Sequence, residues 1–363
     1  MSQLKENISI IGQTHFPAIS IILPLAEGNA RVKVAKDRLN TLIEQAAVVM
    51  LKKYSKQKTD EMIDRMRRTV NKIDFSSSAG SLALFVSPES DRVVHLPYFA
   101  DEKVVVDSSF QVRDLIYSAK LNKNYLLVII SRNNVKTLFG YGSILLPIEF
   151  DGMPDNVNEI RNERSFPGWD YLDTNAYEEK NLKNYLRFID EVIEENIKSS
   201  NLNLIMTGDI KILAYFRNHS RNRDRLIGEI EGNYEKHSLA RLSALIEPLL
   251  NKLILQDQED ALKLLEQSVS SGNFSAGISQ VWRAAAEGRG RLLLVEKDYF
   301  QKAGFGKDSY TLILDELADS SHNVVVDAVD DIIELVLKHN GDVVFFEKDT
   351  LAKFQRIAIV NRY

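Results

Sequence analysis

The chain has 363 residues, of which 44% are hydrophobic and 27% are charged, and its formal net charge is −5. This length predicts two or three domains rather than a single core. Cysteine is absent, which excludes disulfides, thiolate metal ligands and cysteine nucleophiles. The sequence has no apolar run long enough to span a membrane and no secretory signal at its start, so we expect a cytoplasmic protein.

The first predicted domain covers residues 1–140. "AISIILP" (18–24) is typical of a strand that ends at a proline. Two runs of apolar residues at helical spacing follow, separated by "KKYSKQKTDE" (52–61), which predicts a helical hairpin with a polar tip. "GSLALFVS", "RVVHLP" and "EKVVVD" predict consecutive strands, a short helix is expected near residues 112–119, and "YLLVIIS" with "NVKTLFGYG" predicts a strand pair.

The middle predicted domain covers residues 141–268. It begins with the strand "SILLPIEF" and a loop at 151–175, whose length is typical of functional loops. An amphipathic helix follows, and then the strand "LNLIMTGD", where Asp209 is placed to cap the next helix. "LIGEIEGNY" predicts a further strand, and Ser238 is placed to cap a long helix.

The third predicted domain covers residues 269–363 and forms an α/β sandwich. "SSGNFSAG" (270–277) is interpreted as the linker before it, and helices and strands alternate from there to the end. The whole sequence therefore predicts an α/β fold of three domains, each a mixed sheet with packed helices.

No catalytic constellation is recognisable in the sequence. The six histidines are scattered without metal-ligand spacing, and "AGFGKDSY" (303–310) lacks the upstream glycine and the Ser or Thr of a phosphate loop. We therefore predict no catalytic residues, no metal and no cofactor. Triads assembled from distant segments stay open.

Basic residues are concentrated in the predicted hairpin. Twelve basic and five acidic residues lie between Arg31 and Lys72 (12 − 5 = +7), which leaves −5 − 7 = −12 for the rest of the chain. A basic segment on an acidic protein is suited to contact phosphates, although it also fits an ordinary solvated helix. The candidate RNA-binding residues here are Lys52, Lys53, Lys56, Lys58, Arg65, Arg67 and Arg68.

Two further segments are candidates for RNA contact. "RNHSRNRDR" (217–225) carries Arg217, Arg221, Arg223 and Arg225, which within this stretch only Asp224 offsets. In the middle-domain loop, "RSFPGWDY" (164–171) surrounds a Pro-Gly turn with aromatics that either stack on nucleotides or fold back on the core. The candidates in this loop are Arg164, Phe166, Pro167, Gly168 and Trp169.

The order of these parts resembles the bacterial proteins related to archaeo-eukaryotic release factors, the baeRF group. The first domain is similar in "SIILP", the helical hairpin and "FVSP…RVVHLP". "NYLLVIISRNNVKTLFGYG" and "EIEGNYEKHSLARLSALIEPLL" resemble the same group, and "DVVFFEKDTLAKFQRIAIVNRY" is similar to the end of peptide-chain release factors and Pelota.

The resemblance implies a three-domain, release-factor-like and Pelota-like translation factor that binds the ribosome. In that family the first domain reaches the decoding centre, the middle domain the peptidyl-transferase centre, and the last domain partner factors. The implied partners are the ribosome through its rRNA, P-site tRNA, and a translational GTPase, with no membrane; the oligomeric state stays open.

Release factors of this family carry Gly-Gly-Gln on a middle-domain loop, and this sequence contains none. We therefore expect a factor that occupies the A-site tRNA path in ribosome hibernation, rescue or stalled-ribosome recognition without hydrolysing peptidyl-tRNA. Two alternatives stay open. One is an ester hydrolase, acting on peptidyl-tRNA or another ester, that uses the 151–175 loop; the other is a protein-interaction module without RNA binding.

Overall fold

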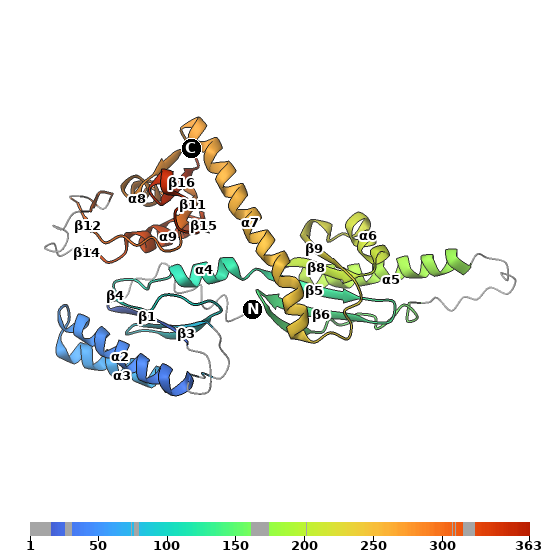
Figure 1. The fold of residues 1–363 in the computed structure, drawn as a ribbon, viewed down its shortest axis with the longest axis horizontal. Helices are drawn as coiled ribbons and strands as arrows, with labels where there is room; N and C mark the ends of the chain where they lie inside the picture. Colours follow the sequence, from blue (N-terminus) through green and yellow to red (C-terminus); the bar gives the residue numbers. More distant parts are fainter. Residues whose placement is uncertain are drawn as a thin grey trace. The chain divides into compact units, whose positions relative to one another are not determined.

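A computed structural model describes residues 16–25, 31–73, 75, 80–160, 174–200, 202–306, 308, 310–314 and 324–363 of the chain (Figure 1). These residues form a mixed α/β fold with several sheets, which confirms the predicted fold class. The chain divides into two compact units: unit 1 is Met1–Lys120 with Gln256–Tyr363, and unit 2 is Leu121–Leu255. Within the described ranges, no helix combines the length and the apolar character that crossing a bilayer requires.

The first sheet of unit 1 is antiparallel, with the strand order β3-β2-β1-β4. Its strands are β1 (Ala18–Pro24), β2 (Ser81–Val86), β3 (Asp91–Leu96) and β4 (Lys103–Asp107). All of β2 is buried, and so is β1 up to Leu23, because the sheet is covered on both faces. This is why both strands are apolar throughout instead of alternating.

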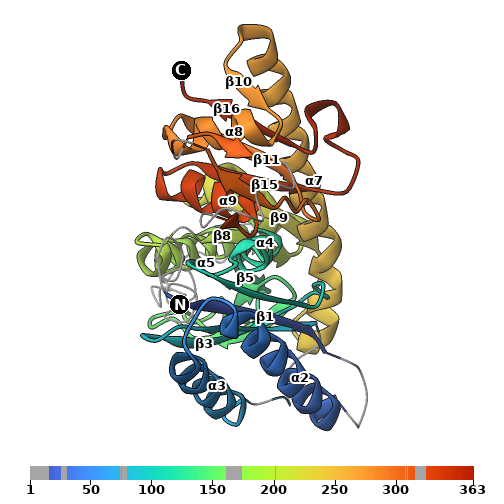
Figure 2. The ribbon, with the colours of Figure 1, turned by 90° about the vertical axis from the view of Figure 1, so that its left-hand side faces the viewer.

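The predicted hairpin is formed by α2 (Arg31–Leu51) and α3 (Lys56–Val70), which lie against one face of this sheet (Figure 2). Side chains on one side of each helix pack on Ile21 and Leu84 of the sheet. The packed helical residues are Leu39, Leu42, Ile43, Ala46, Met50, Met62 and Met66. The 3.6-residue period in the sequence therefore marks the buried side and leaves the charged residues outside.

The second sheet of unit 1 has the strand order β10-β16-β11-β15, with β11 and β15 parallel. Its strands are β10 (Phe274–Ala276), β11 (Gly290–Glu296), β15 (Asp342–Phe346) and β16 (Ile357–Asn361). The other elements of this part are α8 (Ile278–Ala286), α9 (Ala328–Lys338), the 3-10 helix η3 (Ala352–Phe354), and a small sheet of β12 (Ala303–Phe305), β13 (Leu312–Ile313) and β14 (Val324–Val325).

One apolar cluster joins the two larger sheets of unit 1. The second face of the first sheet contributes Ile22 and Phe85, and α4 (Arg113–Leu121) contributes Leu115 and Ile116. The same cluster contains residues of α8 and α9, among them Trp282, Ala285, Ile332 and Ile333. Trp282 is thus a core residue, as its place on an apolar helical face indicates.

Unit 2 is one sheet with the strand order β7-β6-β5-β8-β9 and helices on both faces. Its strands are β5 (Asn124–Ile130), β6 (Val135–Tyr141), β7 (Ile144–Ile148), β8 (Asn203–Gly208) and β9 (Leu226–Glu231). The helices α5 (Thr174–Ile197) and α6 (Ile210–His219) pack on one face, and the first half of α7 (Leu239–Ser271) packs on the other. The 3-10 helix η1 (Arg223–Arg225) precedes β9, and Asp209 caps α6 as predicted.

Two expectations about the segment boundaries need correction. The boundary expected after residue 140 would cut the sheet of unit 2, because β5 and β6 pair with β8 and β7. The linker expected at 270–277 is folded: α7 runs to Ser271, and β10 pairs with β16. Glycine and serine indicated a loop there, but backbone pairing with the distant β16 outweighs that local preference. The division into three domains stays a prediction.

A buried polar contact ties α4 to α9 within unit 1. The carboxylate of Asp330, which is fully buried, accepts hydrogen bonds from the backbone N–H groups of Val112 (3.1 Å) and Arg113 (2.8 Å). The guanidinium of Arg113 donates to the buried carboxylate of Asp327 and to the carbonyl of Tyr299 (2.5 Å). Both carboxylates thus have partners in a place where unpaired charge is costly.

Removing the Arg113 guanidinium leaves the Asp327 carboxylate buried without its partner. We expect Arg113→Met to lower the free energy of unfolding by about 3–5 kcal/mol, measured by chemical denaturation. The control is Arg283→Met, because Arg283 is exposed and its ion pair among the described residues is with Glu287, the C-cap of its own helix. The effect of this control should stay within about 0.5 kcal/mol. Equal effects of the two substitutions would contradict this account.

Asp331 lies beside this contact, and no cationic side chain of the described residues forms an ion pair with it. Burial raises the pKa of Asp331 well above its ordinary value, and repulsion from Asp330 and Asp107 adds to the rise. Because the folded-state pKa is above the unfolded one, the folded protein keeps this proton longer. The stability that the proton provides is lost as the pH rises through the folded-state value.

We therefore expect Asp331→Asn to stabilise the protein at about pH 8, by about 1 kcal/mol or more. Well below the ordinary Asp pKa of about 3.9, the stability difference from the unsubstituted protein should disappear, since the carboxyl is then protonated in both the folded and the unfolded state. Chemical denaturation of both proteins at a series of pH values measures the stability difference in each range. A stability difference between the two proteins that is as large at low pH as at pH 8 would contradict the assignment of the effect to the Asp331 charge.

Candidate nucleic-acid interface

The tip of the hairpin is a short turn, residues 52–55, that is fixed by its own polar groups. The hydroxyl of Ser55 accepts a hydrogen bond from the backbone N–H of Lys58 (3.3 Å) and so caps α3. The hydroxyl of Thr59, which is buried, donates to the carbonyl of Ser55 (3.0 Å). The ammonium of Lys58 lies 5.3 Å from the ring centroid of Tyr54, a favourable cation–π distance.

The lysines at this tip carry charge that no carboxylate of the described residues neutralises by direct contact. Lys52, Lys53 and Lys56 are exposed, and Lys58 is half-buried. Among the described residues, no carboxylate lies within ion-pairing distance of any of these four lysines. The charge of Lys53 acts on Asp107: burial raises the pKa of Asp107, and a backbone hydrogen bond from Ser108 and the charge of Lys53 act against that rise.

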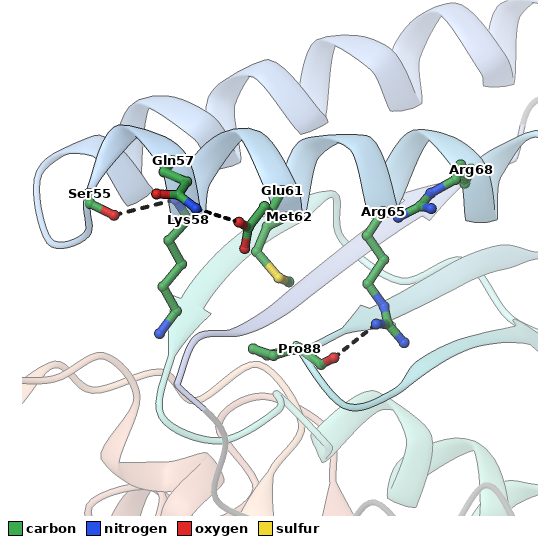
Figure 3. Close-up of a pocket in the computed structure, with 8 residues that line it drawn as sticks. All are labelled: Ser55, Gln57, Lys58, Glu61, Met62, Arg65, Arg68 and Pro88. Atoms are coloured by element: carbon green, nitrogen blue, oxygen red, sulfur yellow. Dashed lines mark hydrogen bonds between the residues drawn. The ribbon is translucent and has the colours of Figure 1, made fainter.

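A surface hollow of about 330 Å³ lies along α3, on the side that faces the turn between β2 and β3 (Figure 3). Met62 and Pro88 give it an apolar part, and Lys58 extends into it. The full lining is Ser55, Gln57, Lys58, Glu61, Met62, Arg65, Arg68 and Pro88. Glu61 is the acidic member, and it accepts a hydrogen bond from the amide of Gln57 (3.1 Å).

Arg65 is the most firmly held cation of this hollow. Its guanidinium donates to the carbonyl of Pro88 (2.9 Å) and to Asp91 (2.9 Å), whose other oxygen accepts from Thr69 (3.0 Å). Burial acts to raise the pKa of Asp91, but the hydrogen bonds from Thr69 and Arg65 outweigh it and hold that pKa below its ordinary value. Arg65 therefore ties α3 to the sheet and has less freedom to bind a ligand than its neighbours.

Arg68 and Arg67 point in different directions although they are adjacent in the sequence. Arg68 lines the hollow, and its one described hydrogen bond goes to the carbonyl of Asp64 (3.3 Å). Arg67 donates to Glu44 of α2 (2.6 Å) and does not line the hollow. The hollow thus gathers Lys58, Arg65 and Arg68 from the predicted set and leaves Arg67 outside.

The arginine stretch is balanced by acids that the sequence interpretation did not consider. Arg217 pairs with Glu229 of β9 through two hydrogen bonds, and Arg221 lies 3.6 Å from Glu191 and 3.4 Å from Glu194 of α5. Arg225 donates to the carbonyls of Ser200 and Leu202 after α5. Within the stretch Asp224 is the only acid, as the sequence shows, but the fold brings further carboxylates from α5 and β9 to these arginines. Arg223 lies 3.7 Å from Asp224.

The loop candidates Arg164, Phe166, Pro167, Gly168 and Trp169 lie outside the described residues. In the part of the chain that is described, no group of three or more acidic or histidine side chains could hold a metal ion. Sequence reasoning missed Asp190, a buried residue of α5 that binds the arginine stretch. In the sequence, the one indication that Asp190 is buried is its position next to Ile189 and near Ile193 on the apolar face of the helix.

Residues 124–289 match the sequence profile of Bacterial archaeo-eukaryotic release factor family 3. This match confirms the resemblance drawn from the sequence, over the segment that contains "NYLLVIISRNNVKTLFGYG" and the arginine stretch. No curated protein matches the sequence.

Several solved structures are similar in fold. An archaeal Pelota in a model of ribosome-bound Pelota and ABCE1 is 10% identical, with a TM-score of 0.44, covering 100% of this chain and 94% of the other. Dom34 of S. cerevisiae is 9% identical, with a TM-score of 0.36 and coverage of 100% and 92%. The archaeal termination factor aRF1 is 12% identical, with a TM-score of 0.25 and coverage of 100% and 96%. Values this low concern the fold and say nothing of function.

Proposed function

We propose that the protein is a cytoplasmic ribosome-associated translation factor whose hairpin binds ribosomal RNA phosphates. It would occupy the A-site tRNA path in hibernation, rescue or stalled-ribosome recognition. The family match over residues 124–289 supports the class of factor. The absence of Gly-Gly-Gln from the sequence supports binding without hydrolysis of peptidyl-tRNA. A translational GTPase as partner stays a prediction.

The observation that carries this proposal is the unneutralised charge at the hairpin tip, next to a basic hollow. Lys52, Lys53 and Lys56 are exposed and have no carboxylate partner among the described residues. Lys58 and Arg68 line the hollow without an ion pair in the same part of the chain. Lysine and arginine side chains in this state can contact a nucleic acid and release its counterions without first breaking an ion pair within the described part of the protein.

The arrangement along α3 fits a polyanion better than a small ligand. Lys58 and Arg65 are seven residues apart on the helix, which corresponds to about 10 Å along its axis, and Arg68 lies one turn further. A row of cations of this length can follow a phosphate backbone, whereas a single phosphate would reach one of them. The exposed Pro88, which lines the same hollow, offers an apolar contact to sugar or base.

Co-sedimentation with purified ribosomes over a salt series tests the proposal. The unsubstituted protein should lose affinity steeply as salt rises, because bound counterions are released. The triple change K52E/K53E/K56E should abolish binding at moderate salt, and Lys58→Gln with Arg68→Gln should reduce the slope of log K against log salt by about 2.

The matched control is K183E/K263E/K353E, which reverses three exposed lysines on other elements. This control should bind like the unsubstituted protein. Binding that is insensitive to salt, or equal loss in the hairpin variant and in the control, would sink the proposal. No binding at low salt would do the same.

A further inference from the structure

The loop after α6 is held by one buried carboxylate from α5. The Asp190 carboxylate is 2% exposed and accepts three hydrogen bonds from the consecutive residues 220–222. The donors are the hydroxyl of Ser220 (2.5 Å), the backbone N–H of Arg221 (2.9 Å) and the side-chain amide of Asn222 (2.9 Å). The N–H of Asn222 in turn donates to the Ser220 hydroxyl (2.9 Å). We call Asp190, Ser220 and Asn222 the Asp190 clasp.

The clasp fixes backbone geometry more than it adds stability. A buried carboxylate is costly unless its oxygens are paired, and an apolar residue at this point of α5 would pack without that cost. Ser220 and Asn222 are also buried, at 4% and 3% exposed, so all three members of the network point inward. A fully satisfied buried network of this kind holds a single conformation, here that of the Arg221 backbone.

The clasp holds the backbone of Arg221, and the residues around Arg221 include a second arginine and two aromatic rings. The side chain of Arg221 is 63% exposed. Tyr215 of α6 lies within electrostatic reach of Arg221 and Arg187. Burial raises the pKa of Tyr215 and the charge of Asp190 adds to that rise, whereas the charges of Arg187 and Arg221 act against it. The His219 ring centroid is 5.7 Å from that of Tyr215. Arginines next to partly exposed rings are typical of single-stranded RNA contacts.

The carboxylates that face Arg221 hold it only loosely. Glu191 and Glu194 lie 3.6 and 3.4 Å from its nitrogens, longer than good charged hydrogen bonds, and both side chains are about 40% exposed. Exposed pairs of this kind contribute little. Arg187 is exposed and has no ion pair among the described residues. A phosphate can therefore replace these carboxylates on Arg221, in a bidentate geometry that suits guanidinium.

We propose that Arg187 and Arg221 form a second phosphate contact for single-stranded RNA, with Tyr215 and His219 as its aromatic part and Asp190 as its positioning residue. This inference rests on the proposed function, because it assumes an RNA ligand. The second contact differs from the hairpin contact in its location, since all of its residues lie in unit 2. The remaining arginines of the stretch are structural: Arg217 joins α6 to β9, and Arg225 binds carbonyls after α5.

The test measures binding of the full chain to a fluorescent oligo(U) RNA over a salt series. Removing one phosphate contact from a single strand lowers the salt slope by about 0.7. We expect Arg221→Gln and Arg187→Gln each to lower the slope by about this amount and to weaken binding several-fold. Lys183→Gln, which removes one exposed charge from the same helix, should leave the slope unchanged.

Asp190→Asn distinguishes positioning from a general structural role. It should lower the slope as much as Arg221→Gln does, and combining the two should lower it no further, because both act on one contact. A merely structural role would lower thermal stability and leave the slope unchanged. If Asp190→Asn does not fold, Ser220→Ala removes one donor of the same clasp and should shift the slope in the same direction.

The outcomes separate this inference from the function on which it rests. If the hairpin variants weaken RNA binding while the Arg187 and Arg221 variants keep the full slope, the second contact is overturned and the proposed function stands. If the unsubstituted chain binds neither ribosomes nor oligo(U), both are overturned. If Asp190→Asn and Arg221→Gln lower the slope additively, Asp190 does not position Arg221.

Discussion

The structure depends on buried carboxylates that accept backbone N–H groups where distant segments meet. Asp330 of α9 receives the first amides of α4, more than two hundred residues earlier in the chain. Burial raises the pKa of Asp330 to about 7, and the charge of Arg113 and the two backbone hydrogen bonds act against that rise. Arg113 and Asp327 complete the contact, and the apolar cluster of α4, α8 and α9 surrounds it. The first sheet of unit 1, which carries the hairpin on its other face, is thereby fixed to α9.

The same arrangement recurs at other junctions. Glu296 of β11 is fully buried and accepts from the N–H of Leu351 and the guanidinium of Arg356. Asp190 of α5 likewise accepts a hydrogen bond from the backbone N–H of Arg221 in the loop after α6. In each case an acid on a regular element accepts a backbone N–H group from a segment that lies far away or in another element. Loops held in this way present side chains in a defined direction, which binding requires.

The positions of the acidic side chains also determine which basic side chains have no ion pair among the described residues. The chain has more acids than bases, yet many acids lie inside or pair with arginines on their own unit. Arg65, Arg67, Arg217 and Arg225 are all committed to protein groups. Among the described residues, the hairpin-tip lysines Lys52, Lys53 and Lys56 have no carboxylate within ion-pairing distance. Net charge therefore says little about the surface: an acidic protein presents a basic tip.

Sequence periodicity predicted the longer elements, since helices bury one side and the spacing of Leu39, Leu42 and Met50 records that directly. It did not indicate the short strands β10, β12, β13 and β14. It predicted the hairpin, the caps at Asp209 and Ser238, and the lysine tip, all of which depend on neighbours in the chain. It could not predict that Glu229 neutralises Arg217, that β10 pairs with β16, or that Asp190 holds the loop after α6. Those contacts join residues that are far apart in sequence, and only the tertiary structure brings their charges and hydrogen-bonding groups within reach of each other.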